Sequence, residues 1–220
     1  MRPSATDLTW SLIAPIVLSA TAVALFVIRA SWAPPTWFMY LPFNLALAWI
    51  PLVLSTVGVV VHRRIVVIPL GVLWLAFLPN AAYMVTDLIH LGPVGPVAEI
   101  FDAVMFCTFA MAAMMAGAVS LKHVFEWFRT QVGTLLAASL VTLFALLAGA
   151  GVWLGRVHRY NSWDLAIDPS APLADVADLF IRPAAHSQDW ALALGCTGML
   201  IALALSGRLW TATRPPSHAQ

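Results

Sequence analysis

The chain has 220 residues and a formal net charge of +1 at pH 7. Hydrophobic residues make up 61% of it and charged residues only 10%, whereas soluble domains carry about 25% charged residues. This composition excludes a soluble globular protein and predicts an integral membrane protein with the lipid bilayer as its environment. The near-zero net charge provides no basic surface for nucleic acid, so we expect no nucleic-acid partner.

Six apolar segments approach the length of about 20 residues that a helix needs to cross a hydrocarbon core. They predict an all-α fold, a polytopic bundle of about six transmembrane helices. We expect a single integral membrane domain over residues 1–212 and a disordered tail at residues 213–220. In chain order the predicted spans are 10–28, 37–61, 65–78 with a continuation beyond Pro79, 103–121, 132–154 and 190–209.

Lysine and arginine are unevenly divided between the two sets of segments that connect these spans. Because positively charged loops stay on the cytoplasmic side, the richer set predicts that both termini are cytoplasmic. Eight of the ten acidic residues then lie on the outer side. The richer set holds Arg2, Arg63, Arg64, Lys122, Arg129, Arg208 and Arg214, and the other set holds Arg29, Arg156, Arg159 and Arg182.

A stripe of polar side chains follows the break at Pro79. Spacings of three or four residues place such side chains on one face of a helix. Ionisable groups at the membrane boundary are candidate functional sites by default, so this face is a candidate site. Its members are Asn80, Tyr83, Asp87 and His90.

Helix rise places two further ionisable residues at the depth of this stripe. A rise of about 1.5 Å per residue puts Asp102 and Arg156 at the same outer boundary as Asp87. Their complementary charges lead us to expect one cluster at the outer leaflet. The expected members are Asp87, His90, Asp102, Arg156 and Arg159.

Two non-enzymatic functions fit this cluster. A structural or partner-docking cap would pair the arginines with the acids and lock the outer end of the bundle. A binder or carrier of an anionic small molecule or lipid headgroup would use Arg156 and Arg159, because guanidinium groups bind phosphate and carboxylate bidentately. Asn80 and Tyr83 would complete that binding site.

The third candidate function is an outer-face membrane enzyme that acts on lipid or cell-wall precursors. Its weak catalytic candidates are Asp87, His90 and Asp102, as acid, base or metal ligands. A metal site needs three or four ligands, and these residues come from distant segments without a signature spacing. No cofactor is predicted, and a metal ion is kept only as an alternative.

Other polar and small residues are assigned structural roles. Asn44 lies inside a span and must find a hydrogen-bond partner there, for which the polar stripe is the expected source. Gly151 and Gly155 form a small-xxx-small spacing that lets another helix approach closely. The predicted structural network comprises Asn44, Thr86, Asn161 and Asp164.

Two connecting segments show amphipathic patterns. Leu173, Val176 and Phe180 share one helical face in the long outer segment, which predicts a short interfacial helix over the outer mouth of the bundle. On the inner side, the apolar residues in 124–128 lie between two cations and predict a second segment that rests on the membrane surface.

Three motifs occur in order along the chain. They are FNLALAWIP at 43–51, WLAFLPNAAYMVTDLIHL at 74–91 and GRVHRYNSWD at 155–164. From Trp37 to Asp168 the chain resembles the bacterial membrane-protein family catalogued as domain of unknown function 1361. The resemblance implies a multi-helix bacterial protein, which together with the charge bias predicts the cytoplasmic (inner) membrane. It implies no activity, substrate or catalytic residue.

Overall fold

The computed structural model describes residues 5–32, 38–61, 64–92, 97, 99–160 and 167–212. Nearly all of them are helical, and no strand occurs within these ranges. The predicted all-α bundle is confirmed, and the protein is a multi-pass membrane protein. Six helical stretches are long and apolar enough to cross a membrane: Thr9–Trp32, Tyr40–Val61, Ile65–His90, Glu99–Val132, Thr134–His158 and Ser187–Ser206.

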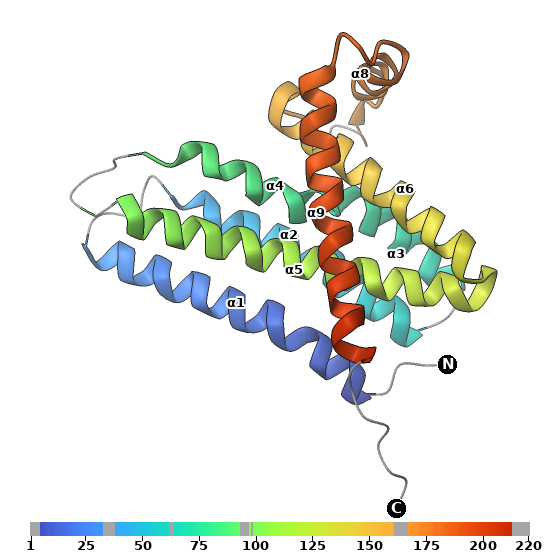
Figure 1. Cartoon of the computed structure of the whole chain (residues 1–220), viewed down its shortest axis with the longest axis horizontal. Helices are drawn as coiled ribbons and strands as arrows, with labels where there is room; N and C mark the ends of the chain where they lie inside the picture. The colour runs from blue at the N-terminus through green and yellow to red at the C-terminus, as the bar shows by residue number, and fades with distance from the viewer. Residues whose placement is uncertain are drawn as a thin grey trace, which may run out of the picture.

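One long helix forms the centre of the bundle. More of it is buried than of any other span, because helices from every other span pack against it. Six of its 16 buried residues are alanine or glycine, for example Ala112, Ala116 and Gly117, and small side chains let neighbouring helices approach closely. This helix and the two that run beside it in Figure 1 are α5 (Glu99–Val132), α1 (Ala5–Trp32) and α2 (Tyr40–Val61).

The third span is broken at Pro79. Proline has no N–H to donate to the Leu75 carbonyl oxygen in the preceding turn, and beside this break Asn80 Nδ2 donates to the carbonyl oxygen of Phe77 at 3.1 Å. The first part of the span packs along α2, whereas the second part packs against α5, α2 and α6. The parts are α3 (Arg64–Phe77), α4 (Pro79–Thr86) and the 3-10 turn η2 (Asp87–His90).

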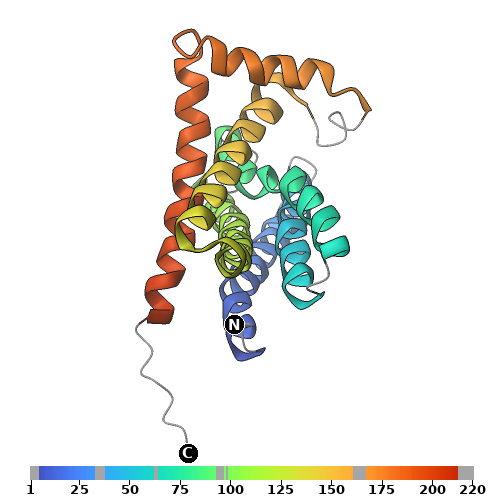
Figure 2. The same ribbon diagram turned by 90° about the vertical axis from the view of Figure 1, so that its right-hand side faces the viewer.

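The last two spans cross the rest of the bundle. They are α6 (Thr134–Trp153), which ends in the π turn η3 (Leu154–His158), and α9 (Ser187–Ala212). Figures 1 and 2 show α9 crossing α5 steeply. α6 and α9 touch at Gly149, where a Cβ atom would lie 2.3 Å from the carbonyl oxygen of Ala193. Only glycine permits this approach.

Gly151 and Gly155 face the third span. A Cβ atom at Gly151 would lie 2.5 Å from Pro79 Cγ, and one at Gly155 would lie 3.0 Å from Tyr83 Cε2. The close approach that the small-xxx-small spacing predicts is therefore made within the chain, between α6 with its π turn and α4.

The long segment between the fifth and sixth spans contains the predicted short helix, α8 (Ser170–Ile181). Its buried side is centred on Leu179, and Val176 packs in the same cluster with the C-terminal end of α6 and the N-terminal end of α9. Leu173 and Phe180 are 58% and 55% exposed. Phe180 nevertheless contacts α9, because its ring lies 5.1 Å from that of Trp190, so Val176 and Phe180 of the predicted apolar face both pack on the bundle.

Residues 124–128, predicted to form a separate segment on the inner membrane surface, are instead a continuation of the helix of the fourth span. α5 continues without a break to Val132, and Phe125 is buried. The neighbouring cation Arg129 bonds within the helix to Glu126, with Nη2 and Oε2 2.6 Å apart. The charge of Arg129 is therefore paired within α5, and the helix continues beyond this residue.

Candidate functional site at one end of the bundle

A first ion pair joins the π turn η3 to the 3-10 turn η2. Arg156 Nη2 donates to Asp87 Oδ1 at 2.6 Å, and the two side chains are 18% and 3% exposed. The other carboxylate oxygen of Asp87 accepts a hydrogen bond from Asn44 Nδ2 at 3.2 Å. Asn44 thus bonds to the polar stripe, and both oxygens of Asp87 have a donor.

The guanidinium group of Arg156 is fixed on two further sides. Its Nε and Nη2 atoms donate to Thr86 Oγ1 at 2.8 and 2.5 Å, and this hydroxyl donates in turn to the carbonyl oxygen of Tyr83 at 2.6 Å. Arg156 Cζ lies 4.5 Å from the centroid of the Tyr83 ring, within the range of a cation–π contact. Tyr83 Oη donates to the carbonyl oxygen of Gly155 at 3.3 Å. The arginine is therefore held in one orientation.

His90 lies at the exposed edge of this group. Its Nε2 atom is 3.4 Å from Arg156 Nη1. Because a guanidinium group only donates, Nε2 accepts, and the proton of the imidazole belongs on Nδ1. The ring makes a T-shaped contact with Tyr40 at 5.8 Å between centroids, and the buried hydroxyl of Tyr40 has no hydrogen-bond partner within the described part of the chain.

Asp102 belongs to a second ion pair. Arg29 Nε donates to its Oδ1 at 2.7 Å and Nη2 donates to its Oδ2 at 3.3 Å, a bidentate arrangement. Both side chains are at most 2% exposed, and Arg29 Cζ lies 5.4 Å from the centroid of Phe38. The single cluster expected from depth is therefore divided into two ion pairs. Helix rise gives the depth of a residue and not its lateral neighbours.

Arg159 is separated from Arg156 by the end of the helix. η3 ends at His158, and Arg159 has a φ of 61°, in the left-handed region. Its side chain is exposed and forms no ion pair among the described residues. The two arginines therefore do not share one helical face, as they would on an unbroken helix.

The remaining candidates take no part in the two ion pairs. Asn80 lies about two helical turns before Asp87 and bonds at the helix break described above. Asn161 and Asp164 lie outside the described residues. Within the described ranges, no group of three His, Cys, Asp or Glu side chains is arranged to hold a metal ion.

A second polar group, which the sequence analysis missed, holds α8 to the bundle. His186 Nδ1 is 2.8 Å from Asp189 Oδ2, and its Nε2 is 2.9 Å from Asp178 Oδ2. These bonds, first to Asp189 and then to Asp178, raise the pKa of His186. His158 Nδ1 lies 3.2 Å from Asp175 Oδ2. The available signal was the spacing of three residues between His186 and Asp189, which matches that of Asp87 and His90.

Six apolar spans and two ion pairs at one end of their bundle define a multi-pass membrane protein with a polar site at its boundary. The family model described as "Protein of unknown function (DUF1361)" matches residues 43–203, and the chain belongs to this family. The matched range includes Asp87, Asp102 and Arg156, whereas Arg29 precedes it. No curated protein and no solved structure matches the chain.

Proposed function

We propose that the two ion pairs form a structural cap at the outer end of the bundle, which presents a fixed surface for docking a partner. The observation that carries this proposal is that both candidate acids are already bonded to arginine. One pair ties the third span to the fifth, and the other ties the first span to the fourth. A carboxylate with both oxygens occupied is poorly suited to act as acid, base or metal ligand, which weighs against the enzyme alternative.

We also propose that the protein lies in the cytoplasmic membrane of a bacterium with both termini in the cytoplasm. An even number of spans puts both termini on one side, and seven of the eleven lysine and arginine residues are in segments of that side. The cap then faces outward. A C-terminal fusion to a reporter that is active only in the cytoplasm should be active, and an inactive fusion to that reporter contradicts this orientation.

The structural role is tested by exchanging the charges of the more buried pair. Arg29→Asp or Asp102→Arg alone places two like charges in contact, and each should cost about 3–5 kcal/mol of unfolding free energy. The double exchange should restore much of this loss. If Asp102 serves a ligand or a reaction instead, Asp102→Asn will leave the thermal midpoint unchanged and the double exchange will restore nothing.

A second candidate function, the binding of an anionic small molecule or lipid headgroup, is favoured by Arg159. A non-glycine residue in the left-handed region costs about 1–3 kcal/mol and is enriched at ligand sites. π turns such as the one before it are also frequent at functional sites. The exposed guanidinium of Arg159 has no acid beside it in the described part of the chain, so it is available to an anion.

Arg159→Gln tests this second candidate against Arg182→Gln, in which the lost guanidinium was already bonded to Asp178. Titration of the detergent-solubilised protein with short-chain phosphatidylglycerol should show binding that is weakened by Arg159→Gln and kept in Arg182→Gln. Equal binding of short-chain phosphatidylcholine would rule out recognition of the negative charge.

A further inference from the structure

A cavity of about 400 Å³ lies at the end of the bundle opposite to the ion pairs, between α2 and α3 on one side and α5 and α6 on the other. α3 packs mainly along α2. It reaches the other two helices through Trp74, whose ring lies 5.6 Å from that of Phe144 and whose Nε1 donates to Ser120 Oγ at 3.2 Å. On the N-terminal side of Trp74, α3 diverges from α5 and α6, and the space between them is the cavity.

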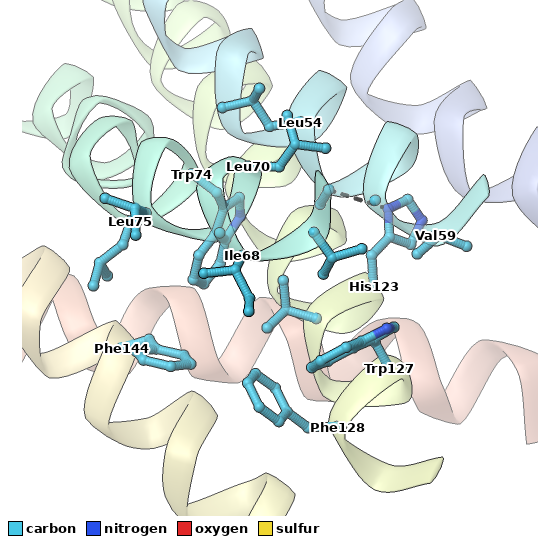
Figure 3. A pocket seen from close by; sticks show the side chains of 16 residues that line it. Leu54, Val59, Ile68, Leu70, Trp74, Leu75, His123, Trp127, Phe128 and Phe144 are labelled. Carbon is cyan, nitrogen blue, oxygen red and sulfur yellow. Dashed lines mark hydrogen bonds between the residues drawn. The ribbon is translucent and has the colours of Figure 1, made fainter. Parts of the chain in front are cut away.

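The walls of this cavity are apolar and largely aromatic. Figure 3 shows Trp127, Phe128 and Phe144 along one side, with Ile68 of α3 close to them. A volume in the range of about 300–1,000 Å³ and mostly apolar walls with few polar groups are typical of ligand sites. Ile68 and Val72 line the cavity and are each 66% exposed. Since both lie within a span, the medium outside the cavity is hydrocarbon.

Some polar groups that border this cavity have a hydrogen-bond partner among the described residues, and one has none. Ser55 Oγ donates to the Leu52 carbonyl oxygen at 3.0 Å, so it accepts from His123 Nδ1 at 3.3 Å, the bond drawn in Figure 3. The other ring nitrogen of His123, Nε2, lies 3.5 Å from Ser11 Oγ, so both polar side chains have partners within the protein. The indole N–H of Trp127, in contrast, donates to no residue in the part of the chain that the structure describes, so it is available to a lipid oxygen.

The depth of Trp127 matches the polar end of a lipid chain. It lies five residues before the end of α5 at Val132, which corresponds to about 8 Å along the helix axis. Tryptophan residues favour this interfacial depth, where their N–H group meets headgroup and ester oxygens. The rest of the cavity extends from there into the hydrocarbon region, along α3.

We propose that this cavity binds one acyl chain of a phospholipid from the surrounding bilayer, and that the ester carbonyl of that chain accepts a hydrogen bond from Trp127 Nε1. A hydrocarbon chain fills the apolar space and restores the van der Waals contacts that the lining residues otherwise lack. The carbonyl group supplies the acceptor that the indole lacks. The site is separate from the ion pairs and does not depend on the proposed cap.

Two glycines make the test specific. Gly58 and Gly71 both line the cavity, and a Cβ atom at either would meet nothing within 4 Å. Gly71→Leu therefore fills the space without pressing on backbone. Gly198→Leu is the matched control, because Gly198 is also an exposed helical glycine with nothing within 4 Å of its Cβ position but lies in α9, away from the cavity.

The full chain in detergent is titrated with a phosphatidylcholine that carries a diazirine on its acyl chain, then irradiated, and the labelled peptides are quantified by mass spectrometry. We expect saturable labelling of residues 67–75 and 123–128. Gly71→Leu should weaken it roughly tenfold, which corresponds to the exclusion of about two methylene groups, and Gly198→Leu should leave it unchanged. Labelling that never saturates and spreads over all lipid-facing surfaces overturns the proposal, as does unchanged labelling in Gly71→Leu.

Of two further variants, one replaces Gly71→Leu if that variant is unfolded, and the other tests the hydrogen bond to the ester carbonyl. Gly58→Leu fills the same cavity from α2 and replaces Gly71→Leu if circular dichroism shows that the latter is unfolded. Trp127→Phe keeps an aromatic ring and removes the donor, so it should weaken binding of an ester-linked phosphatidylcholine and leave an ether-linked one unaffected. Equal loss for both lipids, or no loss for either, overturns the carbonyl contact. If the cavity is labelled only when the protein is diluted, a second copy of the chain occupies it at higher concentration. That result also overturns the proposal.

Discussion

Arg156 follows Asp87 by 69 residues, and its Nη2 atom lies 2.6 Å from the carboxylate of that residue. The contact joins the end of the fifth span to the end of the third. Removing one partner of a buried ion pair leaves an uncompensated charge, whereas replacing both partners by apolar residues is often neutral. The pair is therefore expected to determine how these two spans meet more than how stable the bundle is.

Asp87→Ala should lower the free energy of unfolding by about 3 kcal/mol, because Arg156 then keeps only uncharged partners among the described residues, namely the Thr86 hydroxyl, the Tyr83 ring and the His90 imidazole. Unfolding in mixed detergent micelles, followed by circular dichroism, measures the loss. The double variant Asp87→Ala, Arg156→Leu also removes the unpaired guanidinium group and should recover most of the lost free energy of unfolding. A double variant as unstable as Asp87→Ala would show that the cost does not come from the unpaired arginine.

Asn44→Ala should cost less than the loss of the acid, about 0.6–1.7 kcal/mol, which is the range for hydrogen bonds between transmembrane helices. The amide bonds to the Asp87 carboxylate at 3.2 Å, so the two residues should not act independently. In an Asp87→Ala background, Asn44→Ala should therefore have little further effect on the thermal midpoint. Additive losses would show that Asn44 contributes through packing and not through this bond.

Gly151→Ala should destabilise the protein by about 1–3 kcal/mol through overpacking. The added Cβ would lie 2.5 Å from Pro79 Cγ, and the proline ring cannot yield without moving the break between α3 and α4. Gly195→Ala is the control, since nothing lies within 4 Å of its Cβ position; it should leave the midpoint unchanged or slightly raised. Equal effects of the two variants would contradict a close contact at Gly151.

The spans could be predicted from the sequence because hydropathy reports directly on the solvent around a helix. The break at Pro79 follows in the same way from the missing N–H of proline. The partner of Asn44 was also within reach, because a buried amide must bond and the stripe around Asp87 offered the acceptors. These features depend on one segment at a time or on a requirement that any fold must satisfy.

The pairing of Arg29 with Asp102 could not be predicted in this way. Arg29 lies at the end of a span and was counted only as a loop cation, and depth along a helix does not give its lateral neighbours. The cavity beside Trp127 was missed for a related reason. Apolar residues give the same pattern whether they face lipid, a cavity or another helix, so only the packing of α3 away from α5 and α6 distinguishes these cases.

The contacts of His186 predict that the attachment of α8 depends on pH. Asp189 and Asp178 raise the pKa of His186 above its ordinary 6.5. The contribution of these bonds to stability is therefore complete below 6.5 and is lost as the pH rises through the raised pKa. His186 and then Arg182 lower the pKa of Asp178 below 3.8. The contribution of the Asp178 bonds to stability is therefore present above pH 3.8 and is lost only as the pH falls through the lowered pKa. α8 should be held most firmly in mildly acidic solution and should loosen at alkaline pH.

Spin labels at the exposed positions Leu173 and Leu194, in a variant with both cysteines replaced by alanine, report the separation of α8 and α9. The distance distribution should be narrow in mildly acidic buffer and broaden reversibly as the pH is raised. In His186→Gln the neutral side chain cannot form charged pairs, so the distribution should be broad at every pH. A pH-dependent distribution in His186→Gln would mean that another group, such as His158 beside Asp175, controls the docking of α8.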